Sequence, residues 1–194
     1  PIHGIELRKH HLMADEPANH AKPGRGIYLL PNLFTTAGLF AGFYAIVAAM
    51  NGHFENAALG IIIAGVLDGM DGGVARMTNT QSKFGAEYDS LSDWVAFGVA
   101  PGLVAYAWAL SGLGKFGWVA AFIYVACAAL RLARFNVQAE TTDKRFFIGL
   151  PSPTGAGLVA TLVWLGASRG IEGADISWLV AVVVAGAGLL MVSS

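Results

Sequence analysis

Four aspartates stand in two pairs within a mostly apolar chain, at spacings that could hold a metal ion. Asp68 and Asp71 are three residues apart, and Asp89 and Asp93 are four apart. On helices each pair projects from one face, so two such helices could bring all four carboxylates together. An ionisable side chain inside a membrane helix costs roughly 2.5–3.5 kcal/mol, so stability alone would not retain four of them. The pairs therefore predict a functional site.

The segment between the two pairs suits a phosphate ligand as well as a metal. The nearby cations, Arg76 and Lys83, are too few to neutralise four carboxylates, so we expect divalent metal. Oxygen-only ligands, with no His or Cys nearby, favour Mg²⁺ or Mn²⁺ over zinc. Four glycines remove side chains beside the acids and let phosphates approach the backbone: Gly69, Gly72, Gly73 and Gly85. The competing interpretation is a group of solvated loop acids just outside a bilayer.

The composition places these acids in a membrane protein. Of the 194 residues 55% are hydrophobic and 13% are charged, and the mean hydropathy is +0.57. Six apolar blocks lie near residues 33–50, 55–74, 91–111, 116–135, 155–168 and 176–192. Their lengths suit helices that cross about 30 Å of hydrocarbon, and no strand-like alternation is present. We predict an all-α polytopic protein in which a polar arm, residues 1–30, precedes a bundle of six transmembrane helices, residues 31–194.

The distribution of charge predicts which side of the membrane the acids face. Ten Lys and Arg residues fall on one side: Arg8, Lys9, Lys22, Arg25, Arg76, Lys83, Arg131, Arg134, Lys144 and Arg145. Only Lys115 and Arg169 fall on the other side. Because Lys and Arg are enriched in cytoplasmic loops, we expect both termini and the acids on the cytoplasmic side of the cell membrane. The net charge of −1 by itself says little about partners, and we expect membrane lipid as a partner and no nucleic acid.

Three weaker features complete the membrane prediction. Four tryptophans fall at block ends on the opposite side and resemble an interfacial belt: Trp108, Trp118, Trp164 and Trp178. The stretch Ile5–Ala14 has a weakly apolar face and could form a short amphipathic helix on the membrane surface. Glycines recur four apart, as Gly38/Gly42, Gly65/Gly69 and Gly98/Gly102. Such repeats favour close helix packing inside one bundle, and a homodimer seam is the alternative.

The acidic segment has a recognisable order. It runs Asp68-Gly-Met-Asp71-Gly72-Gly-Val-Ala75-Arg76, followed by Gly85, Asp89 and Asp93. This string resembles the signature of the CDP-alcohol phosphotransferase family, with every fixed position occupied. The resemblance implies that Asp68, Asp71, Asp89 and Asp93 hold Mg²⁺ or Mn²⁺, with two ions expected. It also implies that Asp93 serves as the general base.

The same resemblance implies a set of contacts to the CDP-lipid. The residues concerned are Asn32, Thr35, Gly72, Arg76, Ser82 and Gly85. Asn32 and Thr35 belong to the segment Pro31-Asn32-Leu-Phe-Thr35, which looks like the family's N-terminal element. Read in isolation, Asn32 is equally well explained as a helix cap.

Two further segments bear on the acceptor alcohol. Residues 129–136 and 147–157 look like the serine-specific branch of the family, which implies transfer of the phosphatidyl group from CDP-diacylglycerol to L-serine. Arg131 and Arg134 share a helical face and could meet the serine carboxylate, with Asn136 beside them. Ser152 before Pro153 has the form of an N-cap that would offer backbone N–H groups to an anion. Headgroup anchoring by the arginines and plain capping by Ser152 are the alternatives.

Other functions remain open at this point. Glycerol 3-phosphate or inositol phosphate could be the acceptor in the same family, with the same metal chemistry. A cation or proton transporter could use buried acids, although these acids cluster at one end and form no path across the membrane. An intramembrane aspartyl protease would need only two acids and would leave the Gly-Ala-Arg string unexplained. Metal-dependent release of CMP would separate the enzyme from the last two.

Overall fold

The protein is an array of helices in the computed structural model, which describes residues 29–78, 82–140 and 149–193. Within these ranges the side chains of residues 29–31, 71, 72, 74–78, 139 and 140 are left out of the description. The α-helices are α1 (Leu29–Met50), α2 (Phe54–Thr78), α3 (Lys83–Asp93), α4 (Ala100–Ala105), α5 (Lys115–Glu140), α6 (Ser152–Ser168) and α7 (Ser177–Val192). The described residues contain no strand, as predicted.

Helices α3 and α4 are parts of one long helix that widens twice. A π-helical segment, Trp94–Val99, joins α3 to α4, and a second one, Tyr106–Leu110, follows α4. A 3₁₀ turn, Ser111–Leu113, ends the helix, and another, Gly173–Ile176, leads into α7. We call the continuous helix Lys83–Leu113 the composite helix.

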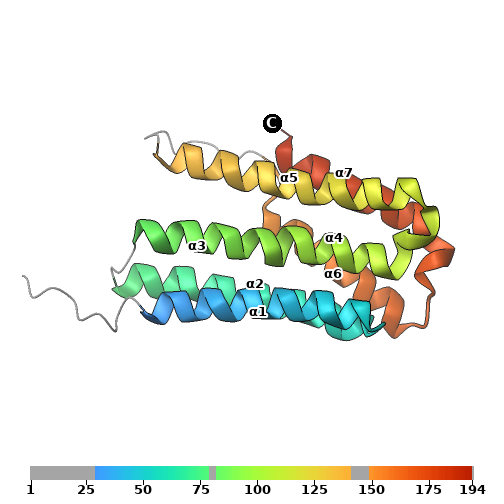
Figure 1. Ribbon diagram of the computed structural model, residues 1–194, viewed down its shortest axis with the longest axis horizontal. Helices are drawn as coiled ribbons and strands as arrows, with labels where there is room; N and C mark the ends of the chain where they lie inside the picture. Colours follow the sequence, from blue (N-terminus) through green and yellow to red (C-terminus); the bar gives the residue numbers. More distant parts are fainter. Residues whose placement is uncertain (1–28, 79–81, 141–148, 194) are drawn as a thin grey trace, which may run out of the picture.

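The helices lie side by side along the long axis of the molecule (Figure 1). Helices α1 and α2 form an antiparallel pair that packs against the composite helix, and α5 packs along α7. Helix α6 packs against α2 and α4. The α1–α2 and α6–α7 connections therefore lie at one end of the bundle. The start of α1, the end of α2, the start of α3 and the end of α5 lie together at the other end, which we call the acidic end.

The interior of the bundle is built from small side chains and its outside from large ones. Several alanines are fully buried: Ala45, Ala57, Ala58, Ala64, Ala100, Ala105 and Ala128. Large apolar side chains are exposed along α1, α2, α5 and α7, for example Phe40, Phe43, Val66, Phe122 and Val182. Small interior residues let helices approach closely in lipid, whereas so much exposed apolar surface would be a liability in water.

Four helical stretches are long and apolar enough to cross a bilayer. They are Asn32–Met50, Lys83–Leu113, Lys115–Gln138 and Gly173–Val192. Together with the outward-facing apolar side chains, they make the chain an integral membrane protein. Helices α2 and α6 match the second and fifth predicted apolar blocks but are not among these four stretches. The predicted count of six spans is thus supported for four stretches, and the amphipathic helix at Ile5–Ala14 lies outside the described residues.

Two glycines of the repeats, Gly42 and Gly102, lie where helices pack closely within the chain, whereas a Cβ atom on Gly69 would meet nothing within 4 Å. A Cβ atom on Gly42 would lie 2.8 Å from the Cα of Ala96, so α1 touches the π-helical segment there. A Cβ atom on Gly102 would lie 2.8 Å from Cγ2 of Val125 on α5. Real Cβ contacts are essentially never that short, so a side chain at either position would push two helices apart. The homodimer stays a prediction.

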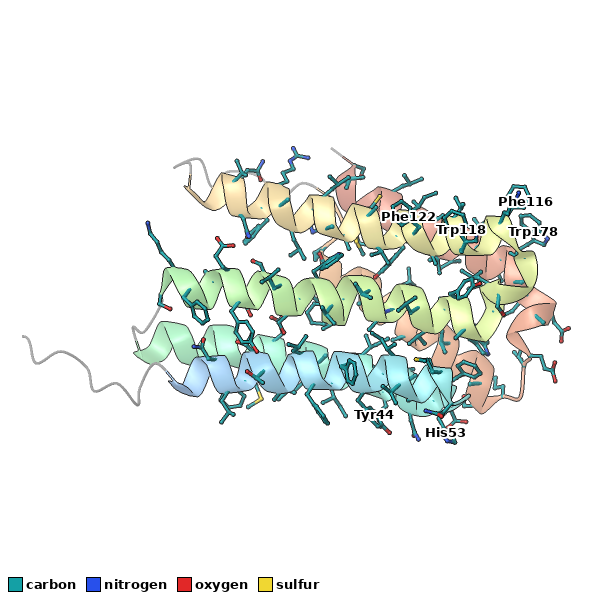
Figure 2. The ribbon with its side chains drawn as sticks, in the orientation of Figure 1. Tyr44, His53, Phe116, Trp118, Phe122 and Trp178 are labelled. Atoms are coloured by element: carbon teal, nitrogen blue, oxygen red, sulfur yellow. The ribbon has the colours of Figure 1, made fainter. Side chains whose placement is uncertain are left out.

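The tryptophans divide into two groups. Trp118, Trp164 and Trp178 are exposed, and Figure 2 shows Trp118 and Trp178 with Phe116 near the end of the bundle opposite the acidic end. The ring centroids of Phe116 and Trp178 are 5.9 Å apart. Trp108 is instead buried, with its ring against the backbone of Gly166. Its assignment to an interfacial belt was therefore wrong: the residue at the block end turns inward and fills a gap between helices.

Candidate metal and phosphate site

Carboxylates from two helices meet at the acidic end. Asp68 projects from α2, while Asp89 and Asp93 project from successive turns of α3. Each offers a carboxylate oxygen, and these three oxygens all lie within 4.8 Å of one another. All three side chains are half-buried. The sequence prediction that the two pairs converge is confirmed for these three acids.

The fourth acid of the prediction lies on the same helix as Asp68. The backbone of Asp71 belongs to α2, one turn beyond Asp68, but its side chain is outside the described residues. The side chain of Arg76, later on α2, is outside them as well, and so are the surroundings of Gly72. Their assigned roles stay predictions.

A small cavity lies directly beside the three carboxylates. Its volume is about 10 Å³, which is about the space that one water molecule needs. Its lining combines the acids with residues of α1, α2 and the π-helical segment: Thr35, Gly38, Ala64, Asp68, Asp89, Ser92, Asp93, Ala96 and Phe97. Thr35 was predicted as a ligand contact, and the structure brings it to the acids.

Ser92 ties the acid-bearing helix to α1. Its side chain is buried, and its hydroxyl donates to the backbone oxygen of Thr35 at 3.0 Å. Because Ser92 directly precedes Asp93, this bond fixes the distance between α1 and the acids. Sequence reasoning missed Ser92. A serine beside an intramembrane acid was the available signal, since a buried hydroxyl needs a partner.

A second polar group forms where α1 and α3 begin. Ser82 is the N-cap of α3, and its hydroxyl accepts the backbone N–H of Gly85 at 3.0 Å. A Cβ atom on Gly85 would lie 3.1 Å from Ser82 Oγ and 3.5 Å from Asn32 Oδ1. The structure therefore brings Asn32, Ser82 and Gly85 together. Asn32 is no helix cap, because α1 begins three residues earlier at Leu29.

Thr36 and Tyr88 hold this group in place. The Thr36 hydroxyl donates to the backbone oxygen of Asn32 at 2.7 Å, and it lies 2.9 Å from the Tyr88 hydroxyl. Tyr88 precedes Asp89, so one hydrogen-bond chain joins the start of α1 to the acid-bearing turn of α3. Neither residue was assigned to the CDP-lipid site from the sequence, because their relation depends on two helices meeting.

The predicted acceptor residues are brought together only in part. Asn136 on α5 accepts a hydrogen bond from the hydroxyl of Ser90, next to Asp89, at 3.1 Å. Arg131 donates to the backbone oxygen of Met191 on α7 at 3.2 Å. Arg134 is exposed. Asn136 thus approaches the acid-bearing helix, whereas Arg131 binds the last turn of α7.

Ser152 begins α6 rather than capping it. The carbonyl of Pro151 accepts the N–H of Gly155 at 3.0 Å, so Pro151 holds the N-cap position. The capping prediction was wrong by one residue, because Pro153 is accommodated in the first turn just as well as at its first position. Ser152 is buried at this helix start.

The three carboxylates fit a divalent cation of the hard, oxygen-loving kind. Oxygens bound to one Mg²⁺ at about 2.1 Å lie at most about 4.2 Å apart, so the three oxygens, all within 4.8 Å of one another, need at most a small inward movement. The described part of the chain holds no other group of three acidic, His or Cys ligands this close together. The site thus consists of a helical membrane bundle with three clustered carboxylates at one end, an arrangement that could hold a divalent cation for phosphate chemistry.

Comparisons with known proteins identify the family of the chain. The family model of the CDP-alcohol phosphatidyltransferases matches residues 28–191, so the chain belongs to this family. Three similar proteins are each named CDP-diacylglycerol–serine O-phosphatidyltransferase. The one from Helicobacter pylori is 46% identical over 143 residues, covering 74% of this chain and 60% of its own length. The chain thus spans about three fifths of that relative.

The other two relatives match a larger share of this chain. The protein from Mycobacterium tuberculosis is 40% identical over 182 residues, covering 88% of this chain and 61% of its own length. The protein from Methanocaldococcus jannaschii is 37% identical over 169 residues, covering 87% of this chain and 73% of its own length. The shared region includes most of the helical bundle in each case.

Proposed function

We propose that the protein transfers the phosphatidyl group of CDP-diacylglycerol to L-serine, giving phosphatidylserine and CMP. The observation that carries the proposal is the meeting of Asp68, Asp89 and Asp93 beside a cavity at one end of a membrane bundle. The family supplies the reaction class, and the names of the similar proteins supply serine as the acceptor.

The metal would be held by the aspartates. Asp68, Asp71, Asp89 and Asp93 would bind Mg²⁺ or Mn²⁺, and four carboxylates are enough to share two ions. When bound, the metal neutralises the pyrophosphate and stabilises the charge that develops on the departing CMP. The three described carboxylates support this assignment, and that of Asp71 rests on its place one helical turn from Asp68.

Asp93 would act as the general base. Its carboxylate takes the proton from the serine hydroxyl, whose oxygen forms a bond to the lipid-side phosphorus. The bond between that phosphorus and the oxygen of CMP breaks, and CMP leaves with the electron pair. The Ser92 hydrogen bond to α1 keeps the Asp93 backbone in place while the proton moves.

The CDP part of the lipid would lie where α1 and α3 begin. Asn32, Ser82 and Gly85 line this position, and Thr35 joins it to the acidic cavity. The absence of a side chain at Gly85 lets the ligand approach the Ser82 and Asn32 oxygens. Gly72 and Arg76 on α2 would contact the phosphates, with the Arg76 guanidinium as a fixed cation.

Gly85→Ala tests this nucleotide position. The new methyl would lie between Ser82 Oγ and Asn32 Oδ1, so we expect the KM for CDP-diacylglycerol to rise about tenfold, with a smaller change in kcat. Steady-state kinetics in mixed micelles would measure both. Gly157→Ala on α6 is the matched control, because a Cβ atom there meets nothing within 4 Å. An unchanged KM in the Gly85 variant would mean that the nucleotide does not bind beside Gly85.

The serine pocket would lie toward α5. Asn136 is hydrogen-bonded to Ser90 beside the acids, and Arg134 and Arg131 precede Asn136 on α5 by two and five residues. A guanidinium can bind the serine carboxylate in a bidentate manner. Ser152, buried at the start of α6, would complete the pocket.

The placement in the membrane is also part of the proposal. Helix α2 packs against α1, and α6 packs against α4 and α7, which all belong to the four apolar stretches. We therefore infer that α2 and α6 also cross the membrane, giving six spans, with α6 about 25 Å long. Lys83, Arg131 and Arg134 lie toward the acidic end, while Lys115 and Arg169 lie at the other end. We therefore infer that the acidic end and both termini are cytoplasmic.

Product analysis tests the reaction. Purified protein with labelled CDP-diacylglycerol is offered L-serine, glycerol 3-phosphate or inositol phosphate, and the lipids are separated by thin-layer chromatography. We expect phosphatidylserine, with CMP release that requires both serine and divalent metal. Phosphatidylglycerophosphate as the sole product would refute serine as the acceptor while leaving the metal chemistry intact.

A further inference from the structure

A proline interrupts the composite helix close to the acids. Pro101 is fully buried within α4. Proline has no N–H, and its ring crowds the carbonyl four residues earlier, which here belongs to Phe97. The helix around Phe97 is the π-helical segment Trp94–Val99, in which the N–H of Ala100 bonds to the carbonyl of Val95, five residues back. The widened turn therefore begins directly after Asp93.

Tyr124 of α5 supplies the hydrogen bond that proline cannot. Its side chain is fully buried, and its hydroxyl donates to the Phe97 carbonyl oxygen at 3.0 Å. In the opposite direction, the indole N–H of Trp94 reaches the carbonyl of Val125 at 3.4 Å. Within a membrane each unsatisfied backbone group costs several kcal/mol, so these bonds stabilise a turn that the helix could not complete alone.

The Tyr124 side chain has little freedom to move. A Cβ atom on Gly155 of α6 would lie 3.5 Å from its hydroxyl oxygen. A Cβ atom on Gly188 of α7 would lie 2.8 Å from the Tyr124 Cα. Tyr124 is thus enclosed where α5, α6 and α7 meet, and its hydroxyl holds the Phe97 carbonyl at a fixed position.

The widened turn borders the acidic cavity. Ala96 and Phe97 line that cavity together with Asp89 and Asp93. One residue of an α-helix turns the chain by about 100°, so the extra residue of a π turn changes the direction in which the preceding side chains point. Suppose that α4 kept its position and the composite helix were regular. The part of the helix before Trp94 would then be rotated, and Asp89 and Asp93 would face away from Asp68.

We propose that Tyr124 is a positioning residue for the metal site. Its hydroxyl replaces the N–H that Pro101 lacks and holds the π turn that directs Asp89 and Asp93 toward Asp68. This inference rests on the proposed function for its effect on turnover, but its effect on metal binding can be measured without any substrate.

The experiment compares Tyr124→Phe, the double variant Tyr124→Phe/Pro101→Ala and the control Tyr44→Phe. Tyr44 is exposed on α1 and points away from the bundle (Figure 2). Bound Mn²⁺ is measured on monodisperse protein by electron paramagnetic resonance. Thermal unfolding and the kcat and KM for CDP-diacylglycerol are measured alongside. The double variant regains a backbone N–H at residue 101, so it can satisfy the Phe97 carbonyl through a regular α-helix.

We expect Tyr124→Phe to weaken Mn²⁺ binding and to lower kcat, each by about tenfold, with KM within about twofold of wild type. The double variant should recover the unfolding temperature without recovering Mn²⁺ binding, because a regular helix turns the acids away. Wild-type Mn²⁺ binding by Tyr124→Phe would overturn the proposal, and so would recovery of Mn²⁺ binding in the double variant. If Tyr124→Phe does not fold, Mn²⁺ binding by the double variant alone decides whether the proposal holds. If wild-type protein binds Mn²⁺ but releases no CMP, the proposed function is refuted. The role of Tyr124 in Mn²⁺ binding can still be tested, because that measurement needs no substrate.

Discussion

Asp93→Asn is expected to lower kcat for CMP release by about 10²- to 10⁴-fold, the range that a positioned general base contributes. Asparagine keeps the size and most of the hydrogen bonding of aspartate, but it cannot take the proton of the serine hydroxyl. The Ser92 bond to α1 does not involve the Asp93 side chain, so the helix should stay in place. The measurement is CMP release from CDP-diacylglycerol at saturating serine and metal.

The control for this variant is Glu87→Gln. Glu87 is an exposed carboxylate on the same helix, so its loss changes the charge of α3 without touching the cavity. Bound Mn²⁺ should be determined in both variants, because Asp93 is also expected to bind metal. If Asp93→Asn loses turnover even at metal concentrations that saturate it, Asp93 is the general base. CMP release at the wild-type rate by Asp93→Asn would show that another group takes the proton.

The convergence of the acids could be predicted because its causes are local. Spacings of three and four place each pair on one helical face, and the cost of a lone carboxylate in an apolar segment requires compensation. Hydropathy is equally local, and each predicted apolar block falls on a helix. The third helix begins at Lys83, eight residues before the predicted block, because its acid-bearing turns are polar and escape a search for apolar residues.

What could not be predicted depends on which helices become neighbours. Pro101 signals a disturbed turn four residues earlier, but nothing in the sequence indicates that Tyr124, 27 residues from Phe97, donates the missing bond. Trp108 has the sequence position of an interfacial residue, and its burial against Gly166 depends on which helices become neighbours. The contribution of Asp71 to the metal site stays a prediction from its spacing, as do the roles of Gly72 and Arg76.

Asp68→Asn should have the largest effect on metal binding, because Asp68 is the one member of the described carboxylate group that comes from α2. Removing it leaves only the α3 carboxylates of that group, so we expect the Mn²⁺ concentration for half-maximal activity to rise about 10- to 100-fold or more. Excess Mn²⁺ should then restore part of the turnover, unlike in Asp93→Asn, where the proton acceptor itself is gone. Chelation should abolish wild-type activity, and Mg²⁺ or Mn²⁺ should restore it.

Glu55→Gln, at the far end of α2 and exposed, is the matched control for Asp68→Asn, and its activity should depend on Mn²⁺ concentration as in wild type. An unchanged Mn²⁺ requirement in Asp68→Asn would mean that the ion binds to α3 without α2, and the two-helix site would be wrong.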